Sequence, residues 1–181
     1  AEMYVQGVST RKVAAVVEQL CGCEVSSSQV SRAAALLDEK LEAWRNSEVG
    51  EIVYLLLDAR YEKVRQDGRI RDVAVLIAAG IDREGRRKVL GVSISLSEQE
   101  VHWRVFLESL VKRGLRGVEL IISDDHSGLK AARQAVFGGI PWQRCQFHLQ
   151  QNAQAYVPRK EMQKEVAVYN PSPNLPYYFW K

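Results

Sequence analysis

The chain has 181 residues, of which 46% are hydrophobic and 26% charged, a balance typical of a folded globular protein rather than a disordered one. The longest apolar run, residues 73–79, is too short to cross a bilayer, which needs about 20 residues. No secretory signal opens the chain, so we expect a cytoplasmic protein with no membrane partner. Three cysteines, an odd number, give no sign of a disulfide framework.

The net charge of +3 is unevenly distributed. Residues 1–50 carry 5 basic and 7 acidic side chains, whereas residues 51–181 carry 20 and 15. A phosphate-binding surface needs a local basic excess. The larger segment is therefore the expected place for one, although a solvated face would show the same excess.

The first segment, residues 1–48, is predicted to be helical. Apolar residues recur at helical spacing from residue 13 to 20, Ser9 or Thr10 can cap that helix, and Gly22 is a usual helix stop. A second helix begins near residue 26. Two helices around a short turn suggest a partial helix-turn-helix, with DNA-binding residues near the start of its second helix: Ser28, Gln29 and Arg32. The alternative is a helical hairpin used only for packing, and the acidic balance of this segment favours it.

After a linker at residues 46–50, the pattern changes to strands. Three strands joined by two tight turns are predicted at residues 51–59, 73–79 and 88–96. Ser97 and Glu100 form a capping-box pattern that opens a helix ending near residue 112. Further elements are expected in alternation: a strand at 118–123, a helix at 127–136, a strand at 142–145 and a helix at 147–167 with a break at Pro158. Three antiparallel strands followed by alternating helix and strand make a mixed α/β sheet, in the order of the ribonuclease H-like fold.

Two acidic residues follow neighbouring strands of this predicted sheet. Asp58 ends the first strand and Asp124 directly follows the fourth. If these strands lie side by side, the two carboxylates meet, and a bound Mg²⁺ or Mn²⁺ would relieve their repulsion. Two such ions can support phosphodiester displacement. The plainer interpretation is a pair of turn or cap residues. Asp125 is an alternative ligand, but we expect it to cap the helix that begins near residue 127.

Other polar residues flank these positions. Cys145 and His148 are three residues apart, a weak zinc half-site because no second pair is present to complete four ligands; two packing residues are the simpler reading. His148 could also lie near the carboxylates. Basic residues that could form a groove for DNA phosphates are Arg60, Lys63, Arg65 and Arg144. A solvated charged rim is an equally good interpretation.

Several longer segments carry a family resemblance. They are LDARYEKVR at 57–65, GRRKVLG at 85–91, RGLRGV at 113–118, SDDHSGLKAA at 123–132 and WQRCQFH at 142–148. With these motifs, the chain resembles the Mutator-type transposases of bacterial insertion sequences, from residue 3 to about residue 160.

The resemblance implies a function and a set of site residues. The family cuts and joins DNA with an Asp-Asp-Glu triad that binds two divalent metal ions, Mg²⁺ or Mn²⁺. Asp58 would be the first acid and Asp124 the second, and Cys145 and His148 would be the auxiliary Cys-x-x-His pair near the site. The expected partner is DNA, the terminal inverted repeats of the mobile element. The intact protein is expected to be a homo-oligomer associated with the bacterial nucleoid.

The chain also departs from the family. The third acid lies well downstream in the family, and this chain stops before it, so residues 51–160 are expected to form an incomplete catalytic core that is inactive alone. Residues 168–181 no longer match and are expected to be a divergent tail. Two alternatives are therefore a non-catalytic DNA-binding remnant of a transposase and a different ribonuclease H-like nuclease that acts on RNA–DNA hybrids.

Overall fold

The computed structural model describes residues 9–66 and 68–156. Contacts divide the chain into two compact units, with the boundary between Glu48 and Val49. The predicted tail at 168–181 and the last part of the predicted final helix, including Pro158, lie outside the described residues. No helix in the described ranges is long and apolar enough to cross a membrane.

The first unit contains helices α2 (Thr10–Cys21) and α3 (Ser27–Arg45). The Ser9 hydroxyl accepts a hydrogen bond from the Lys12 backbone N–H, and Gly22 ends α2 in the left-handed conformation, φ 64°. Both predicted signals are confirmed. Ser26 begins α3 through a capping box with Gln29. Two helices joined by a short turn are thus present, and their use as a DNA-binding helix-turn-helix stays a prediction.

The second unit is built on a five-stranded mixed sheet of order β3-β2-β1-β4-β5. The strand pairs β1–β2 and β2–β3 are antiparallel, whereas β1–β4 and β4–β5 are parallel. The predicted mixed α/β order is confirmed. The element bounds are β1 (Tyr54–Gln66), β2 (Arg69–Ile81), β3 (Arg87–Ser95), α4 (Glu100–Lys112), β4 (Leu120–Ser123), α5 (Ser127–Phe137), β5 (Trp142–Arg144) and α6 (Gln146–Ala155).

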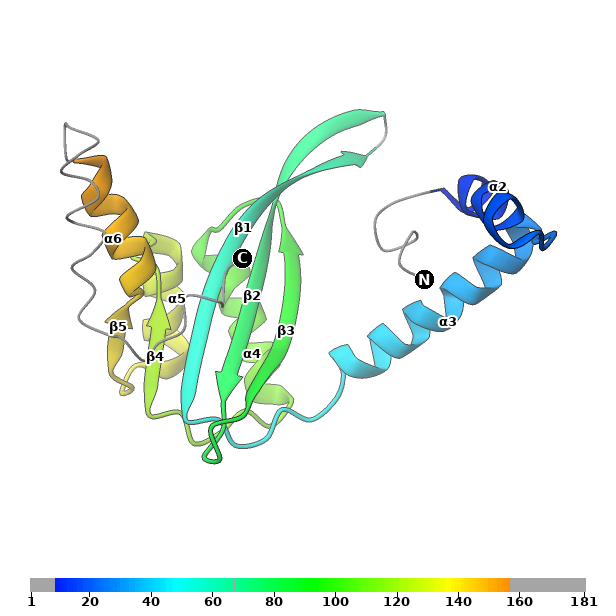
Figure 1. Ribbon diagram of the computed structural model, residues 1–181. Coiled ribbons are helices and arrows are strands. Elements are labelled where there is room, and N and C mark those ends of the chain that lie inside the picture. Colours follow the sequence, from blue (N-terminus) through cyan, green and yellow to red (C-terminus); the bar gives the residue numbers. More distant parts are fainter. Residues whose placement is uncertain (1–8, 67, 157–181) are drawn as a thin grey trace. The chain divides into compact units, whose positions relative to one another are not determined.

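This topology brings distant segments to one edge of the sheet. Strands β1, β3, β4 and β5 run in the same direction, so the carboxyl ends of β3, β4 and β5 lie at the upper edge in Figure 1, which β1 crosses. The chain segments that follow β3, β4 and β5 leave the sheet there. We call this the carboxyl edge, and ligands of open α/β sheets bind outside such edges.

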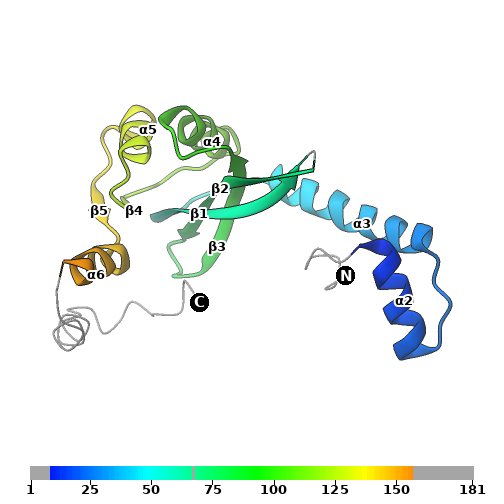
Figure 2. The ribbon, with the colours of Figure 1, turned by 90° about the horizontal axis from the view of Figure 1, so that it is seen from above.

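The hydrophobic core lies between the sheet and two helices. Helices α4 and α5 lie together over one face, and α6 lies beyond β5, away from them (Figure 2). The apolar side chains between the sheet and these helices are removed from water, and their packing gives the carboxyl edge a rigid base. The fully buried side chains include Leu55, Leu76, Trp103, Leu107, Leu110, Ile121 and Leu129.

Two strands are much longer than predicted. The first strand was expected at 51–59 and the second at 73–79, yet β1 reaches Gln66 and β2 begins at Arg69. β4 pairs with β1 only up to Leu57, and β3 pairs with β2 only from Ala74. Residues 62–66 and 69–73 therefore pair only with each other, and Figure 1 shows them continuing past the rest of the sheet. We call this segment the ribbon.

Two predicted helix caps are wrong. Helix α4 begins at Glu100 with Gln99 as its N-cap and no capping side chain. The predicted partners of that cap act elsewhere: Glu100 pairs with Arg104 one turn on, and the Ser97 carbonyl accepts from the Ser95 hydroxyl. Helix α5 has His126, not Asp125, as its N-cap. The two acidic side chains pair instead with nearby cations, Glu100 with Arg104 and Asp125 with Lys130.

The turn between β2 and β3 depends on the buried carboxylate of Asp82. Burial raises the pKa of Asp82, but hydrogen bonds from the Arg86 side chain and backbone, and from Lys88, outweigh it and hold the pKa at about 2. The Arg86 Nε lies 2.9 Å from Asp82 Oδ2. This folded pKa is below the unfolded value of 3.8. The carboxylate therefore stabilises the fold above pH 4, and that stabilisation is lost as the pH falls toward 2.

We expect Asp82→Asn to remove this part of the acid sensitivity. Urea unfolding of the native chain should show a decreasing free energy between pH 4 and pH 2.5, and the decrease should be smaller in the variant. An equal pH dependence in both proteins would show that the Asp82 ion pairs contribute nothing to folding.

Candidate active site

Asp58 and Asp124 lie side by side at the carboxyl edge. Leu57 of β1 is the register partner of Ser123 in β4, and the two aspartates are the next residues along their parallel strands. Adjacent strands are about 4.8 Å apart. The side chains of Asp58 and Asp124 are 15% and 39% exposed, so Asp58 is the more enclosed of the pair. Asp58 lies within β1, which continues beyond it, rather than at the strand end that the sequence suggested.

The surroundings of Asp58 disfavour its negative charge. Burial is the largest influence and raises its pKa; His148 and the backbone N–H of Ala59 lower it, and the charges of Glu98 and Asp124 raise it again. The net direction is upward. A carboxylate held among like charges in a partly dry site is an unfavourable arrangement for an isolated protein, and perturbed groups of this kind gather at functional sites.

Helix α6 supplies a histidine to this pair. The Nε2 of His148 is 3.8 Å from Asp58 Oδ1, and its side chain is 21% exposed. Cys145 is the N-cap of α6, and its backbone N–H donates to the Ser123 carbonyl at 2.6 Å. Cys145 therefore fixes the start of α6 against β4, and the following turn places His148 beside Asp58. In the described ranges, no further cysteine joins this pair to complete a zinc site.

A third carboxylate, which the sequence analysis missed, lies at the same edge. Glu98 follows β3, and only 15% of its side chain is exposed. Burial raises its pKa, His126 lowers it, Asp124 raises it and His148 lowers it. The Oε2 of Glu98 is 4.0 Å from Nδ1 of His126. In the sequence, Glu98 is one of three polar residues before a helix, and only the packing of β3 beside β2 brings it toward the aspartates.

Glu98 and His126 border a pocket at the carboxyl edge. The pocket has a volume of about 380 Å³ and is lined by Tyr61, residues 97–100 and residues 126–128. Gly128 permits the close approach of its two walls. A Cβ atom at Gly128 would overlap the Glu98 carbonyl oxygen and lie 2.9 Å from the Glu100 backbone nitrogen. The β3–α4 segment thus rests directly on the start of α5.

Asp125 has partners of its own. Its Oδ1 is 2.8 Å from Lys130 Nζ, and this hydrogen bond is the largest influence lowering the pKa of Asp125. Arg144, on β5, lies between the two acids, with NH1 3.6 Å from Asp125 Oδ2 and Nε 4.0 Å from Asp124 Oδ1. Arg144 was predicted to bind DNA; its side chain is 30% exposed, and it faces these carboxylates.

The other predicted DNA-binding residues fall into two groups. Arg60, Lys63 and Arg65 are exposed along β1 beyond Asp58, and Arg60 forms an ion pair with Glu62. The second group lies at the start of α3 in the other unit. There the Gln29 side chain accepts from the Ser26 backbone N–H, and the Ser28 hydroxyl is 2.9 Å from the Ser26 hydroxyl. Arg32 is exposed one turn further on.

The carboxylates fit a hard divalent cation. In the described part of the chain, no group of three or more His, Cys, Asp or Glu side chains is arranged around a common metal position. Mg²⁺ usually takes one or two protein carboxylates, and water and substrate phosphates complete its coordination. Asp58 and Asp124 match that pattern: they are oxygen donors from neighbouring strands, and the charge of Asp124 raises the pKa of Asp58.

Comparison with known sequences identifies relatives along nearly the whole chain. The family model described as "Transposase, Mutator family" matches residues 1–169. The transposase for insertion sequence element IS406 of Burkholderia multivorans is 64% identical over 92% of this chain and 44% of its own length. The transposase for IS256 in transposon Tn4001 of Staphylococcus aureus is 44% identical over 88% of this chain and 41% of its own. The chain thus spans less than half the length of these relatives.

Among solved structures, the catalytic core domain of HTLV-2 integrase in complex with magnesium covers 71% of this chain and 79% of that chain, with 12% identity and a TM-score of 0.31. That likeness is too low to align residues of the two proteins. Family membership rests instead on the sequence match, which includes every segment that forms the carboxyl edge. The chain belongs to the Mutator family of transposases.

Proposed function

We propose that residues 49–156 form the part of a ribonuclease H-like transposase core that holds a divalent metal ion and presents it to DNA. The strand order β3-β2-β1-β4-β5 supports that fold, with three antiparallel strands followed by two parallel ones. The observation that carries the proposal is the placement of Asp58 and Asp124 on neighbouring parallel strands, where the charge of Asp124 raises the pKa of Asp58. The reaction would be cleavage and strand transfer of the ends of a mobile element.

Asp58 and Asp124 would hold Mg²⁺ or Mn²⁺ through their oxygens. The chemistry supplied at such a site is activation of the attacking oxygen and stabilisation of the leaving oxygen of a phosphodiester. Because the charge of Asp124 disfavours ionisation of Asp58, a divalent cation held by the two would be bound with a gain that an isolated carboxylate would not provide. The buried position of Asp58 also keeps competing water away from one side of the site.

The remaining residues would organise the charge around that site. Glu98 adds a third negative group close to Asp124, and His126 balances it from the start of α5. His148 stands next to Asp58 on the opposite helix, α6, where it can donate a hydrogen bond to the carboxylate or to a phosphate oxygen. Arg144 offsets the charge of Asp124 and Asp125. The site is therefore acidic at its centre and has cations around its rim.

The proposal is tested by titrating Mn²⁺ into the native chain, with and without duplex DNA, in a calorimeter. We expect saturable binding that strengthens as the pH rises from 4 to 7.5, because a carboxylate with a raised pKa must lose its proton before it binds metal. We also expect duplex DNA to increase the Mn²⁺ affinity, since phosphate oxygens complete the coordination. Absence of saturable Mn²⁺ binding at both pH values would contradict the proposal.

A further inference from the structure

The ribbon projects from the carboxyl edge, and of its described residues only Val73, at its base, is buried. The first four residues of β2, 69–72, are all exposed, so both faces of the ribbon are in contact with water there. A two-stranded hairpin with no hydrophobic face contributes little to stability by itself. Its length is therefore unexplained by folding, and its side chains are available to a partner.

The basic side chains of the ribbon have no acidic partner among the described residues, whereas several cations elsewhere in the unit do. Arg83, Arg86, Arg104, Lys130 and Arg144 each lie within 4.0 Å of a carboxylate. Four exposed cations of the ribbon form no ion pair with any described residue: Lys63, Arg65, Arg69 and Arg71. Glu62 pairs with Arg60, which leaves Asp72 as the one unpaired acid of the ribbon's described residues.

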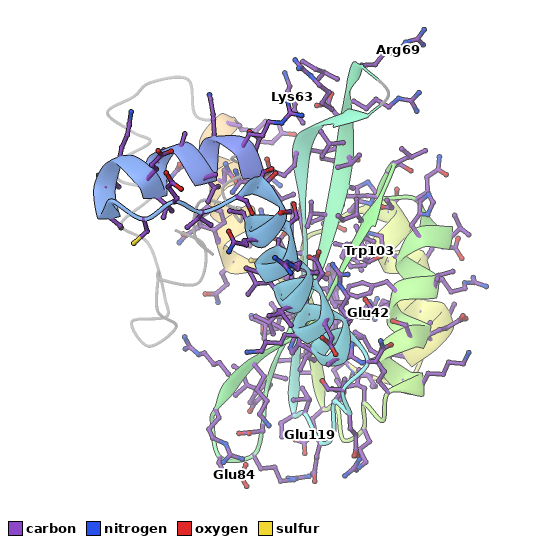
Figure 3. The ribbon with its side chains drawn as sticks, turned by 90° about the vertical axis from the view of Figure 1, so that its right-hand side faces the viewer. Glu42, Lys63, Arg69, Glu84, Trp103 and Glu119 are labelled. Atoms are coloured by element: carbon purple, nitrogen blue, oxygen red, sulfur yellow. The ribbon has the colours of Figure 1, made fainter. Side chains whose placement is uncertain are left out.

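The register places these cations in a regular arrangement. Arg69 and Arg71 are two residues apart in β2 and so point to the same face, about 6.6 Å apart along the strand. Lys63 and Arg65 are likewise two residues apart in β1. Their cross-strand partners, Asp72 and Ile70, alternate with Arg69 and Arg71 along β2, so Lys63 and Arg65 point to the opposite face. Figure 3 shows Lys63 and Arg69 at the end of the second unit opposite Glu84 and Glu119.

The ribbon also has a fixed relation to the candidate metal site, because β1 passes continuously from one to the other. Arg65 is seven residues beyond Asp58, and at about 3.3 Å per residue the two are roughly 23 Å apart. That distance corresponds to about seven base pairs of B-form DNA. A duplex whose phosphate reaches Asp58 and Asp124 can therefore extend along the ribbon.

We propose that the ribbon is an arm that binds the sugar–phosphate backbone of duplex DNA about six to seven base pairs from the reacting phosphate. Rows of unpaired cations, exposed on both faces of a narrow two-stranded element, fit a polyanion whose grooves admit a β-ribbon. The contacts are to phosphates, so the arm positions DNA without reading its sequence. This inference rests on the proposed function, because the reacting phosphate is located by Asp58 and Asp124.

The test compares two double variants of the whole chain. Arg69→Gln with Arg71→Gln removes two charges from the ribbon, and Arg83→Gln with Lys112→Gln removes two from the opposite end of the sheet, where the β2–β3 turn and the end of α4 lie. Binding to a fluorescent duplex of about 30 base pairs is measured by anisotropy from 50 to 300 mM salt. Thermal unfolding should be unchanged in the ribbon variant, because all of its altered side chains are exposed.

Each phosphate contact contributes about 0.9 to the slope of log affinity against log salt. Relative to 1 M salt, one contact therefore contributes about eightfold in affinity at 0.1 M. We expect the ribbon variant to bind about sixtyfold more weakly at 0.1 M salt, with its slope reduced by about 2. The control should stay within about twofold of the native chain, since charges beyond the Debye length of about 10 Å are screened.

The outcomes separate this inference from the proposed function. If the native chain binds duplex DNA and Mn²⁺ but the ribbon variant keeps the native affinity and salt slope, the arm is refuted and the metal site is not. Absence of duplex binding by the native chain at 50 mM salt would overturn both. A preference for single-stranded RNA over duplex DNA of equal length would also overturn the arm.

Discussion

Asp58→Asn is expected to weaken Mn²⁺ binding at least a hundredfold and to abolish any metal-dependent cleavage of DNA by this chain. Changes to groups that only support a metal ligand typically weaken metal binding by 10- to 100-fold, so loss of a ligand itself should exceed that range. The amide of asparagine keeps the shape of the side chain but not its charge. Calorimetric titration of Mn²⁺ into both proteins at pH 7.5 measures the difference directly.

The neighbouring acid provides the matched control. Asp125→Asn removes a carboxylate from the same edge, but one that already interacts with Lys130 and Arg144. We expect it to change the Mn²⁺ affinity by less than about threefold and, as a surface ion pair, to alter stability by at most about 1 kcal/mol. Equal losses in the Asp58 and Asp125 variants would mean that general negative charge, not a specific ligand, attracts the ion.

Asp58→Asn should also stabilise the metal-free protein. Burial and two neighbouring acids raise the folded pKa of Asp58 above 3.8, so the native state binds more protons than the unfolded state in that interval. The free energy of unfolding therefore falls as the pH rises from 3.8 through the folded pKa. Asp58→Asn removes this penalty, and we expect a higher free energy of unfolding at pH 7.5, a gain common when strained functional sites are neutralised.

Added Mn²⁺ should reverse the order of stability. Metal that binds only the folded state stabilises it by RT ln(1 + [Mn²⁺]/Kd), about 2.7 kcal/mol at a concentration of 100 Kd. The native chain should therefore unfold at a higher temperature with Mn²⁺, and the Asp58 variant should respond far less, because its Mn²⁺ affinity is at least a hundredfold weaker. Because metal-free stability and metal response move in opposite directions, a variant that was merely misfolded would not reproduce the result.

Much of the sheet could be predicted from the sequence because its strands are buried. Apolar runs mark the parts of β1 and β2 that contact α4 and α5, and an aspartate at the end of each of two such runs is visible without a structure. The ribbon could not be predicted in the same way. Most of its residues are polar, and it is held together by cross-strand backbone hydrogen bonds, which leave no hydrophobic periodicity in the sequence.

Glu98 shows a different limit of sequence reasoning. Its local pattern, a glutamate shortly before a helix, is typical of a cap, and the capping box predicted for Ser97 and Glu100 is absent. The importance of Glu98 depends on burial and on charges from segments 26 to 50 residues away in the chain. Gly128 lets Glu98 approach those charges. Its role could not be predicted either, because nothing in the neighbouring sequence indicates close packing there.

Gly128→Ala is therefore expected to disturb both the fold and the candidate metal site. The new Cβ would overlap the Glu98 carbonyl oxygen and lie 3.1 Å from the carbonyl carbon of Gln99, and these are backbone atoms that cannot rotate away. Overpacking of this kind costs about 2 kcal/mol. The β3–α4 segment must move away from α5, which would carry Glu98 away from His126 and Asp124. Urea unfolding and Mn²⁺ titration measure the two effects.

The appropriate control is Gly139→Ala, at the end of the same helix. No atom lies within 4 Å of the Cβ position at Gly139, and its φ is not in the left-handed region. We expect that change to alter stability by less than about 0.5 kcal/mol and the Mn²⁺ affinity not at all. Gly128→Ala should differ by lowering the Mn²⁺ affinity about tenfold under conditions where the protein is still folded, as loss of a supporting carboxylate does.

The two measurements on Gly128→Ala distinguish packing from charge. A loss of stability with native Mn²⁺ affinity would show that Glu98 fills space beside α5 and has no influence on the aspartates, which would remove it from the site. A loss of both would make the β3–α4 segment part of the metal site. In that case Glu98→Gln, which keeps the packing and removes the charge, should reproduce the lower Mn²⁺ affinity without the loss of stability, since the neutral side chain no longer suffers the burial that raises the pKa of Glu98.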